Sequence, residues 1–177
     1  MKKKFKFLVF ATSLAFFSFS LTGCSSKESR ERAQSLSSSR SARRESLRKS
    51  EAEKSATENE QIKKANNQLV QDLKGNQDDA ANGNHNYDYS TYVEKIEIHS
   101  DTQAYVYVDE SFMNLDDVAK TKVGNSISNL VLRSMATSGM DIQPEDQKRG
   151  IYLAFYTGGN KALGHSRFTN YNEYKFY

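Results

Sequence analysis

The distribution of apolar side chains sets the strongest limit on what this chain can fold into. Between residues 25 and 58, Ser, Arg, Glu, Lys and Ala dominate, and Leu36 and Leu47 stand apart as isolated large apolar residues. Such a segment cannot bury enough apolar surface to offset the entropy that is lost on ordering. From residue 91 onward, apolar residues recur with the periods of strands and helices. We therefore expect a disordered tether at 24–57, a long linker that is flexible or partly helical before the domain, and one folded domain at 91–177.

A helical pattern lies between the tether and this domain. Between residues 58 and 75, apolar residues recur at roughly helical spacing, at Ile62, Ala65, Leu69, Val70 and Leu73. Gly75 and Asn76 are typical of a helix end, and residues 76–90, rich in Asn, Asp, Gly and Ala, predict a flexible break. The apolar stripe is narrow, so it leaves open whether this short helix docks on the following domain, self-associates weakly or stays only partly helical.

The first half of the domain predicts a hairpin and a helix. Residues 92–99 and 103–109 each alternate apolar and polar side chains, and the polar residues 100–102 between them favour a turn. Asn114 then predicts a helix N-cap. Apolar residues line one helical face from there to Gly139, which is the expected stop.

The second half predicts more strands. After a polar loop at 141–150, residues 151–156 and 162–168 flank a Gly-Gly turn, which indicates another hairpin. Residues 171–177 predict a short fifth strand. The order β-β-α-β-β, with one amphipathic helix, predicts a small two-layer α+β domain in which the helix covers one face of an antiparallel sheet.

Four tyrosines occupy the alternate positions of the predicted strands, opposite the aliphatic residues that would face the helix: Tyr105, Tyr107, Tyr152 and Tyr156. Tyrosine rings on an open sheet suit the binding of a protein, a peptide or a glycan, because each ring offers apolar area with a polar tip. Two alternatives remain open. Tyr is a good strand former in its own right, and the helix at 58–75 could cover this face.

The amino-terminal residues resemble the signal peptide of a bacterial lipoprotein. Four lysines within the first six residues precede an apolar run of about fifteen residues, which is too short to span a membrane. Leu21, Thr22, Gly23 and Cys24 then match a lipobox, in which cleavage occurs before the cysteine. The resemblance implies a signal peptide at 1–23 and a lipid on Cys24, the first mature residue. It also implies that the rest of the chain is tethered to the outer side of the cell membrane.

Cysteine usage agrees with this interpretation. Cys24 is the only cysteine in the chain, so no intramolecular disulfide can form and no cysteine-based metal site is available. Two acyl chains hold a protein durably at a membrane, whereas one holds it only marginally. A diacylglyceryl group on Cys24 would supply two.

The charge distribution argues against a nucleic-acid partner. The chain has a formal net charge of +3. The first 24 residues contribute four lysines and no acids, and residues 25–80 hold twelve basic and ten acidic residues. Residues 81–177 hold nine basic and twelve acidic residues, so the expected domain is mildly acidic. Binding to phosphate groups needs a concentrated basic face, and we expect none here.

No motif in the chain is specific for catalysis. The three histidines, His85, His99 and His165, share no metal-ligand spacing. His165 and Ser166 are adjacent in a predicted strand, so their side chains should point to opposite faces. We expect no cofactor and no metal ion.

These observations favour a non-enzymatic binding or accessory protein of the cell envelope, with an envelope protein or a peptide as its partner. Two alternatives remain. One is a small envelope hydrolase that uses His99 or His165 with a carboxylate. The other is a role for the leader itself, because residues 17–23 resemble the short hydrophobic pheromone peptides that some Gram-positive bacteria release from lipoprotein leaders.

Overall fold

The computed structural model describes residues 27–159 and 161–177, and their side chains from residue 38 onward. The lipobox at 21–24 lies outside the described residues. The chain divides into two compact units, Met1–Leu47 and Arg48–Tyr177. The described part of the first unit is a stretch of helix, while the second unit holds the sheet and the core.

Helix α1 (Lys27–Ala81) is much longer than the predicted one at 58–75. The expectation of a disordered tether is wrong for residues 27–57, which are helical. Ala, Arg, Lys and Glu are strong helix formers, and the sequence contains no Gly or Pro between residues 27 and 74. A lack of apolar residues excludes a buried segment, but it does not exclude a helix whose backbone hydrogen bonds close locally. Side chains 38–57 are exposed, as expected for a solvated segment.

The flexible break predicted at 76–90 is also wrong. Helix α1 passes through Gly75 and is followed by a 3₁₀ helix, η1 (His85–Tyr92). Asn76 is buried and donates a hydrogen bond of 2.6 Å to the hydroxyl oxygen of Tyr89. The side chain of Gln77 donates a hydrogen bond of 2.8 Å to the carbonyl of Val93. The polar side chains that suggested a loop therefore hold the end of α1 against the segment that leads into the sheet.

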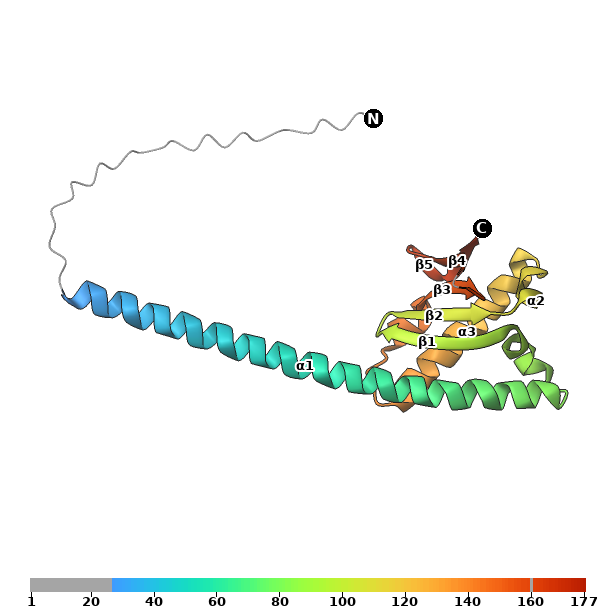
Figure 1. Ribbon diagram of the computed structural model, residues 1–177, viewed down its shortest axis with the longest axis horizontal. Helices are drawn as coiled ribbons and strands as arrows, with labels where there is room; N and C mark the ends of the chain where they lie inside the picture. Colours follow the sequence, from blue (N-terminus) through green and yellow to red (C-terminus); the bar gives the residue numbers. More distant parts are fainter. Residues whose placement is uncertain (1–26, 160) are drawn as a thin grey trace, which may run out of the picture. The chain divides into compact units, whose positions relative to one another are not determined.

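Five strands form one sheet in sequence order: β1 (Val93–Ser100), β2 (Gln103–Val108), β3 (Tyr152–Thr157), β4 (Lys161–Arg167) and β5 (Asn170–Phe176) (Figure 1). The α+β class and both predicted hairpins are confirmed. The sheet is mixed, however, and not antiparallel, because β2 and β3 run parallel. A helical connection of a dozen residues or more allows a parallel crossover. Alternation along a strand does not reveal the direction of its neighbour.

The crossover between β2 and β3 contains three helices: α2 (Glu110–Met113), α3 (Asp117–Thr137) and α4 (Pro144–Arg149). The predicted start of the main helix is shifted. Asp116 is the N-cap and accepts a hydrogen bond of 2.7 Å from the backbone of Ala119, while Asn114 ends α2. Gly139 follows α3 with a positive φ of 86°, as expected for a helix stop. The predicted loop at 141–150 contains α4, because Pro144 stands at the first position of a short helix.

The core lies between α3 and one face of the sheet. Phe112 stacks on Phe155 with ring centroids 5.7 Å apart, and both residues are fully buried. Gly124 lets α3 approach β5, because a Cβ atom there would lie 2.6 Å from the ring of Tyr174. That ring packs edge-on against Phe155 at 5.5 Å. Close contact between helix and sheet thus depends on the absence of a side chain at Gly124.

The last turns of α1 belong to this core as well. Ala65, Leu69 and Leu73 are buried in it. Asp72 accepts a hydrogen bond of 2.7 Å from the hydroxyl of Ser134 on α3. The compact unit therefore begins well before residue 91, the start that the sequence predicted. The question of whether the helix docks on the domain is answered for this part of α1.

Candidate functional site

The strand register brings the four predicted tyrosines to one face of the sheet. Tyr107 lies between Lys95 on β1 and Tyr156 on β3. In the same layer, Tyr105 lies opposite Glu97 of β1. All four tyrosines, including Tyr152, are half-buried, whereas the residues between them on β2 and β3 are buried. The shared face follows directly from the two-residue period of the strands.

Rings on the β1 side of this face contact one another. His99 stacks on Tyr105 with centroids 5.1 Å apart. Tyr156 lies 5.7 Å from both Tyr105 and Tyr107, edge-on to the first and stacked on the second. Offset and edge-to-face pairs at such distances are favourable arrangements for aromatic rings. The tyrosines therefore form a connected layer rather than separate side chains.

A second group of rings surrounds Tyr152 on the β5 side of the face. Tyr152 lies 6.0 Å from the ring of His165, 5.3 Å from Phe168 and 5.8 Å from Tyr171. Tyr177 lies 5.9 Å from His165. We use the name aromatic face for both groups together: His99, Tyr105, Tyr107, Tyr152, Tyr156, His165, Phe168, Tyr171 and Tyr177.

Five of these residues were not predicted to belong to the face. Tyr171 and Tyr177 occupy alternate positions of the last strand and were accessible to the same two-residue argument. Phe168 lies in the turn after β4, where periodicity gives no direction, and it is 80 % exposed. His99 and His165 were considered as catalytic candidates and not as members of this face. Their ring contacts with the tyrosines depend on which strands are neighbours in the sheet, and the sequence does not show that order.

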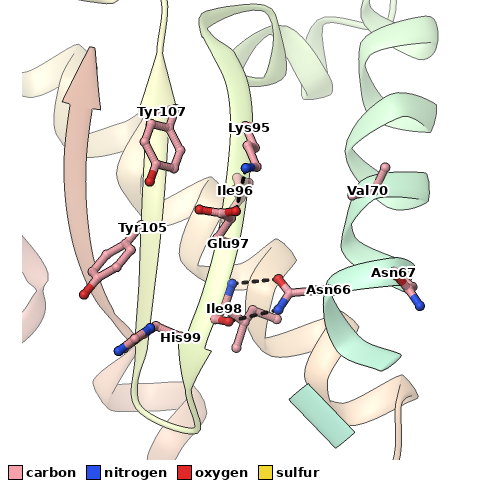
Figure 2. Close-up of a pocket in the computed structure, with 10 residues that line it drawn as sticks. All are labelled: Asn66, Asn67, Val70, Lys95, Ile96, Glu97, Ile98, His99, Tyr105 and Tyr107. Carbon is pink, nitrogen blue, oxygen red and sulfur yellow. Dashed lines mark hydrogen bonds and ion pairs between the residues drawn. The ribbon is translucent and has the colours of Figure 1, made fainter. Parts of the chain in front are cut away.

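Helix α1 borders the aromatic face and does not cover it. A shallow groove of about 520 Å³ runs between α1 and β1, with Tyr105 and Tyr107 along its sheet side. Figure 2 shows Asn67 and Val70 on the helix side and the Lys95–Glu97 ion pair on β1. Val70 is 63 % exposed. The face that the sequence could not assign as open or covered is open in the described part of the chain.

Four ionisable groups of this face, on Lys95, Glu97, Tyr107 and Tyr152, keep their ordinary charge states at neutral pH. The hydrogen bond to Glu97 raises the pKa of Lys95, and the hydrogen bond to Lys95 lowers the pKa of Glu97. Burial raises the pKa of Tyr107, and burial followed by the neighbouring phenols raises the pKa of Tyr152. The phenols of Tyr107 and Tyr152 therefore remain neutral and are able both to donate and to accept hydrogen bonds.

The geometry does not bring the two catalytic candidates together. His99 on β1 and His165 on β4 are separated by three strand spacings, about 14 Å at ~4.8 Å per spacing. The ring nitrogen Nδ1 of His165 lies 2.8 Å from the carbonyl oxygen of Ser166, while the Ser166 hydroxyl faces the core and accepts from the backbone of Leu153. As predicted, the two neighbouring side chains point to opposite faces.

Carboxylates and metal ligands do not gather around these histidines. Within residues 38–159 and 161–177, the one histidine that pairs with a carboxylate is His85, whose Nδ1 lies 3.1 Å from Asp88 in η1. Over the same residues, no three His, Cys, Asp or Glu side chains are close enough to hold a metal ion.

Comparison with known proteins gives no relative for this chain. No protein-family model matches it, and neither a curated protein nor a solved structure is significantly similar to it. Among the described helices, none has a stretch long and apolar enough to cross a membrane.

Proposed function

We propose that this chain is a membrane-anchored, extracytoplasmic lipoprotein that acts as a non-enzymatic binding or accessory protein of the cell envelope. The anchor rests on the lipobox at Leu21, Thr22, Gly23 and Cys24. The binding role rests on one observation, the open aromatic face. A lipid on Cys24 keeps the protein at the membrane surface, and the aromatic face receives a partner protein there.

The composition of the face fits a protein partner. Contact regions between proteins are rich in aromatic side chains and poor in unpaired charge at their centre. On this face Lys95 is paired with Glu97, and the guanidinium of Arg167 lies 4.0 Å from Glu173. The remaining surface consists largely of rings with hydroxyl tips. Such a surface suits a neutral, amphipathic protein surface better than a polyanion.

The extent of the face also fits this role. Its rings lie on all five strands, in the turn after β4 or directly after β5, so that it spans about 19 Å at ~4.8 Å per strand spacing. A few buried aromatic side chains typically carry most of the free energy of such an interface. Tyr107 and Tyr152, one in each group of rings, are the expected energetic centres.

The binding role is tested with full-length protein in native membranes. We expect Tyr107→Ala together with Tyr152→Ala to abolish recovery of a co-purifying envelope protein. With that partner purified, its dissociation constant should rise at least about 10-fold. Val118→Ala is the matched control, since Val118 is 65 % exposed on α3, in the other layer. Equal recovery with the double variant and the control would sink the assignment of this face.

The anchor is tested separately by metabolic labelling with a palmitate analogue. Cys24→Ser removes the only sulfur that can accept diacylglyceryl, so we expect no label and a larger, uncleaved precursor. Leu21→Lys should have the same effect by breaking the lipobox. If the Cys24→Ser protein still takes up label and migrates at the mature size, the lipoprotein assignment is wrong, whatever the aromatic face binds.

A further inference from the structure

The two edges of the sheet differ in how they are protected. The outer edge of β1 faces α1. The side chain of Asn66 donates a hydrogen bond of 2.9 Å to the carbonyl of Ile98 and accepts one of 2.8 Å from the amide of the same residue (Figure 2). The side chain of Asn66 therefore makes the hydrogen bonds with Ile98 that a neighbouring strand would otherwise make. Strand β5 forms the other edge, at the far end of the sheet from α1 (Figure 1). Free strand edges are sites of association unless something blocks them.

The backbone of β5 has groups that point away from the sheet. The amide of Tyr177 donates a hydrogen bond of 2.9 Å to the carbonyl of Leu163 on β4. Because hydrogen-bonding directions alternate along an antiparallel strand, the amides and carbonyls of Tyr174 and Phe176 point outward. Within the described part of the chain, no loop or side chain hydrogen-bonds to these outward groups. This edge contains no proline, and its register with β4 is regular from Tyr174 to Phe176.

The sequence of β5 is complementary to itself about Tyr174. In an antiparallel pair of two β5 strands with a two-fold axis at Tyr174, Glu173 of each copy lies opposite Lys175 of the other. Both residues are on the open face of the sheet and are exposed. Tyr171 lies opposite Tyr177 in the same way, which places rings against rings. Opposite charges and aromatic pairs directly across two strands are stabilising.

We infer that β5 is a homodimerisation edge, where two copies of this chain join antiparallel about Tyr174 into one continuous sheet. Tyr174 of each copy exchanges both backbone hydrogen bonds with Tyr174 of the second copy. The aromatic faces of the two copies then lie on the same side and continue across the dimer axis. The inference does not depend on the lipid anchor or on a partner of the aromatic face.

Charge selects this register over its neighbours. Side chains opposite each other in a sheet must lie on the same face, so that the axis can pass through Glu173, Tyr174 or Lys175 but not between them. An axis at Glu173 places two glutamates opposite each other, and an axis at Lys175 does the same with two lysines. Like charges directly opposite are destabilising. Of these three axes, the one at Tyr174 avoids both like-charge pairs and places each Glu173 opposite a Lys175.

Charge reversal tests both the interface and its register. Two differently tagged copies of the full-length chain are expressed together, and co-purification in detergent is measured. We expect Lys175→Glu in both copies to weaken the association at least about 10-fold, because each Glu173 then faces a glutamate. Glu173→Lys in both copies should do the same by opposing two lysines.

Mixing the two variants distinguishes this register from simple loss of folding. A Lys175→Glu copy with a Glu173→Lys copy restores an opposite charge at every crossing, so we expect their association to return to near the wild-type level. The double variant Glu173→Lys with Lys175→Glu should also associate, and thermal unfolding shows whether each chain is folded. A folded Lys175→Glu protein that associates as strongly as wild type would overturn the inference. So would a failure of the mixed pair to recover, or the absence of self-association in the wild type.

Discussion

The two faces of the sheet carry different side chains on the same strands. On β2 and β3, the residues that face α3 are fully buried aliphatic and phenyl groups, such as Val106, Leu153 and Phe155. Their neighbours on the other face are half-exposed tyrosines. Because successive residues alternate in direction, one strand can supply stability from one face and recognition from the other. The comparison indicates that the aromatic face is not needed to complete the core.

The largest expected effect separates the two faces by stability. Phe155→Ala removes a fully buried ring that packs against Phe112 and Tyr174, and we expect a loss of about 3–5 kcal/mol in the free energy of unfolding. Tyr107→Ala on the open face should cost about 1 kcal/mol or less. Urea unfolding of the two variants measures both values. Similar losses would show that the aromatic face is part of the structural core.

A second effect probes how closely the core face is packed. Gly124→Ala places a methyl group 2.6 Å from the buried ring of Tyr174, and overpacking of this kind costs about 1–3 kcal/mol. The higher helix propensity of Ala offsets about 1 kcal/mol of that cost. Gly75→Ala on α1 is the matched control, since nothing lies within 4 Å of a Cβ atom there and the substitution should stabilise the protein. A Gly124→Ala variant that is stabilised as much as Gly75→Ala would contradict the tight packing.

The alternation that separates the faces was also the most reliable information in the sequence. It predicted the hairpin of β1 and β2, the strands β3 and β4, and the common face of Tyr105, Tyr107, Tyr152 and Tyr156. Each of these features depends on the period of one strand or on a short turn. The α+β class followed from the same patterns and from the amphipathic α3.

The errors arose where the structure depends on partners distant in the sequence. The parallel pairing of β2 with β3 is set by the crossover through α3, which leaves no trace in either strand. Asn76 and Gln77 were assigned to a flexible break because they are polar, yet their side chains bond to η1 and β1. Asn66, which the sequence did not single out, bonds to β1 as well. The composition of a segment shows that it lacks apolar residues, but it does not show which distant polar groups its side chains bond to.

A third effect concerns the edge of the sheet rather than its faces. Asn66→Ala leaves both the amide and the carbonyl of Ile98 without partners at a partly buried edge, and we expect a loss of about 1–2 kcal/mol. Asn67→Ala, one residue further along α1 and exposed, should change the free energy of unfolding by less than about 0.5 kcal/mol. If thermal unfolding finds the two variants equally stable, the side chain of Asn66 does not protect β1.

The smallest effect is a pH dependence to which Tyr174 on the core face should contribute. Burial raises the pKa of Tyr174, whose hydroxyl lies 3.1 Å from Asn125. The unfolded chain ionises this phenol at about pH 10 while the folded chain keeps it protonated, so stability is complete below pH 10 and falls as the pH rises above it. Each such group lowers the stability by about 1.4 kcal/mol per pH unit. In urea unfolding between pH 9 and 11, Tyr174→Phe should flatten this dependence, and an unchanged slope would contradict it.

The most direct test of the account places a photoreactive amino acid at residue 107 or at residue 118 of the full-length chain in living cells. Residue 107 lies on the aromatic face, and residue 118 is an exposed position of α3 in the opposite layer. We predict a discrete cross-linked species with one partner protein from position 107, and none from position 118. Its yield should fall when Tyr152→Ala is added. Equal cross-linking from both positions, or none from either, would contradict the claim that the aromatic face receives a partner.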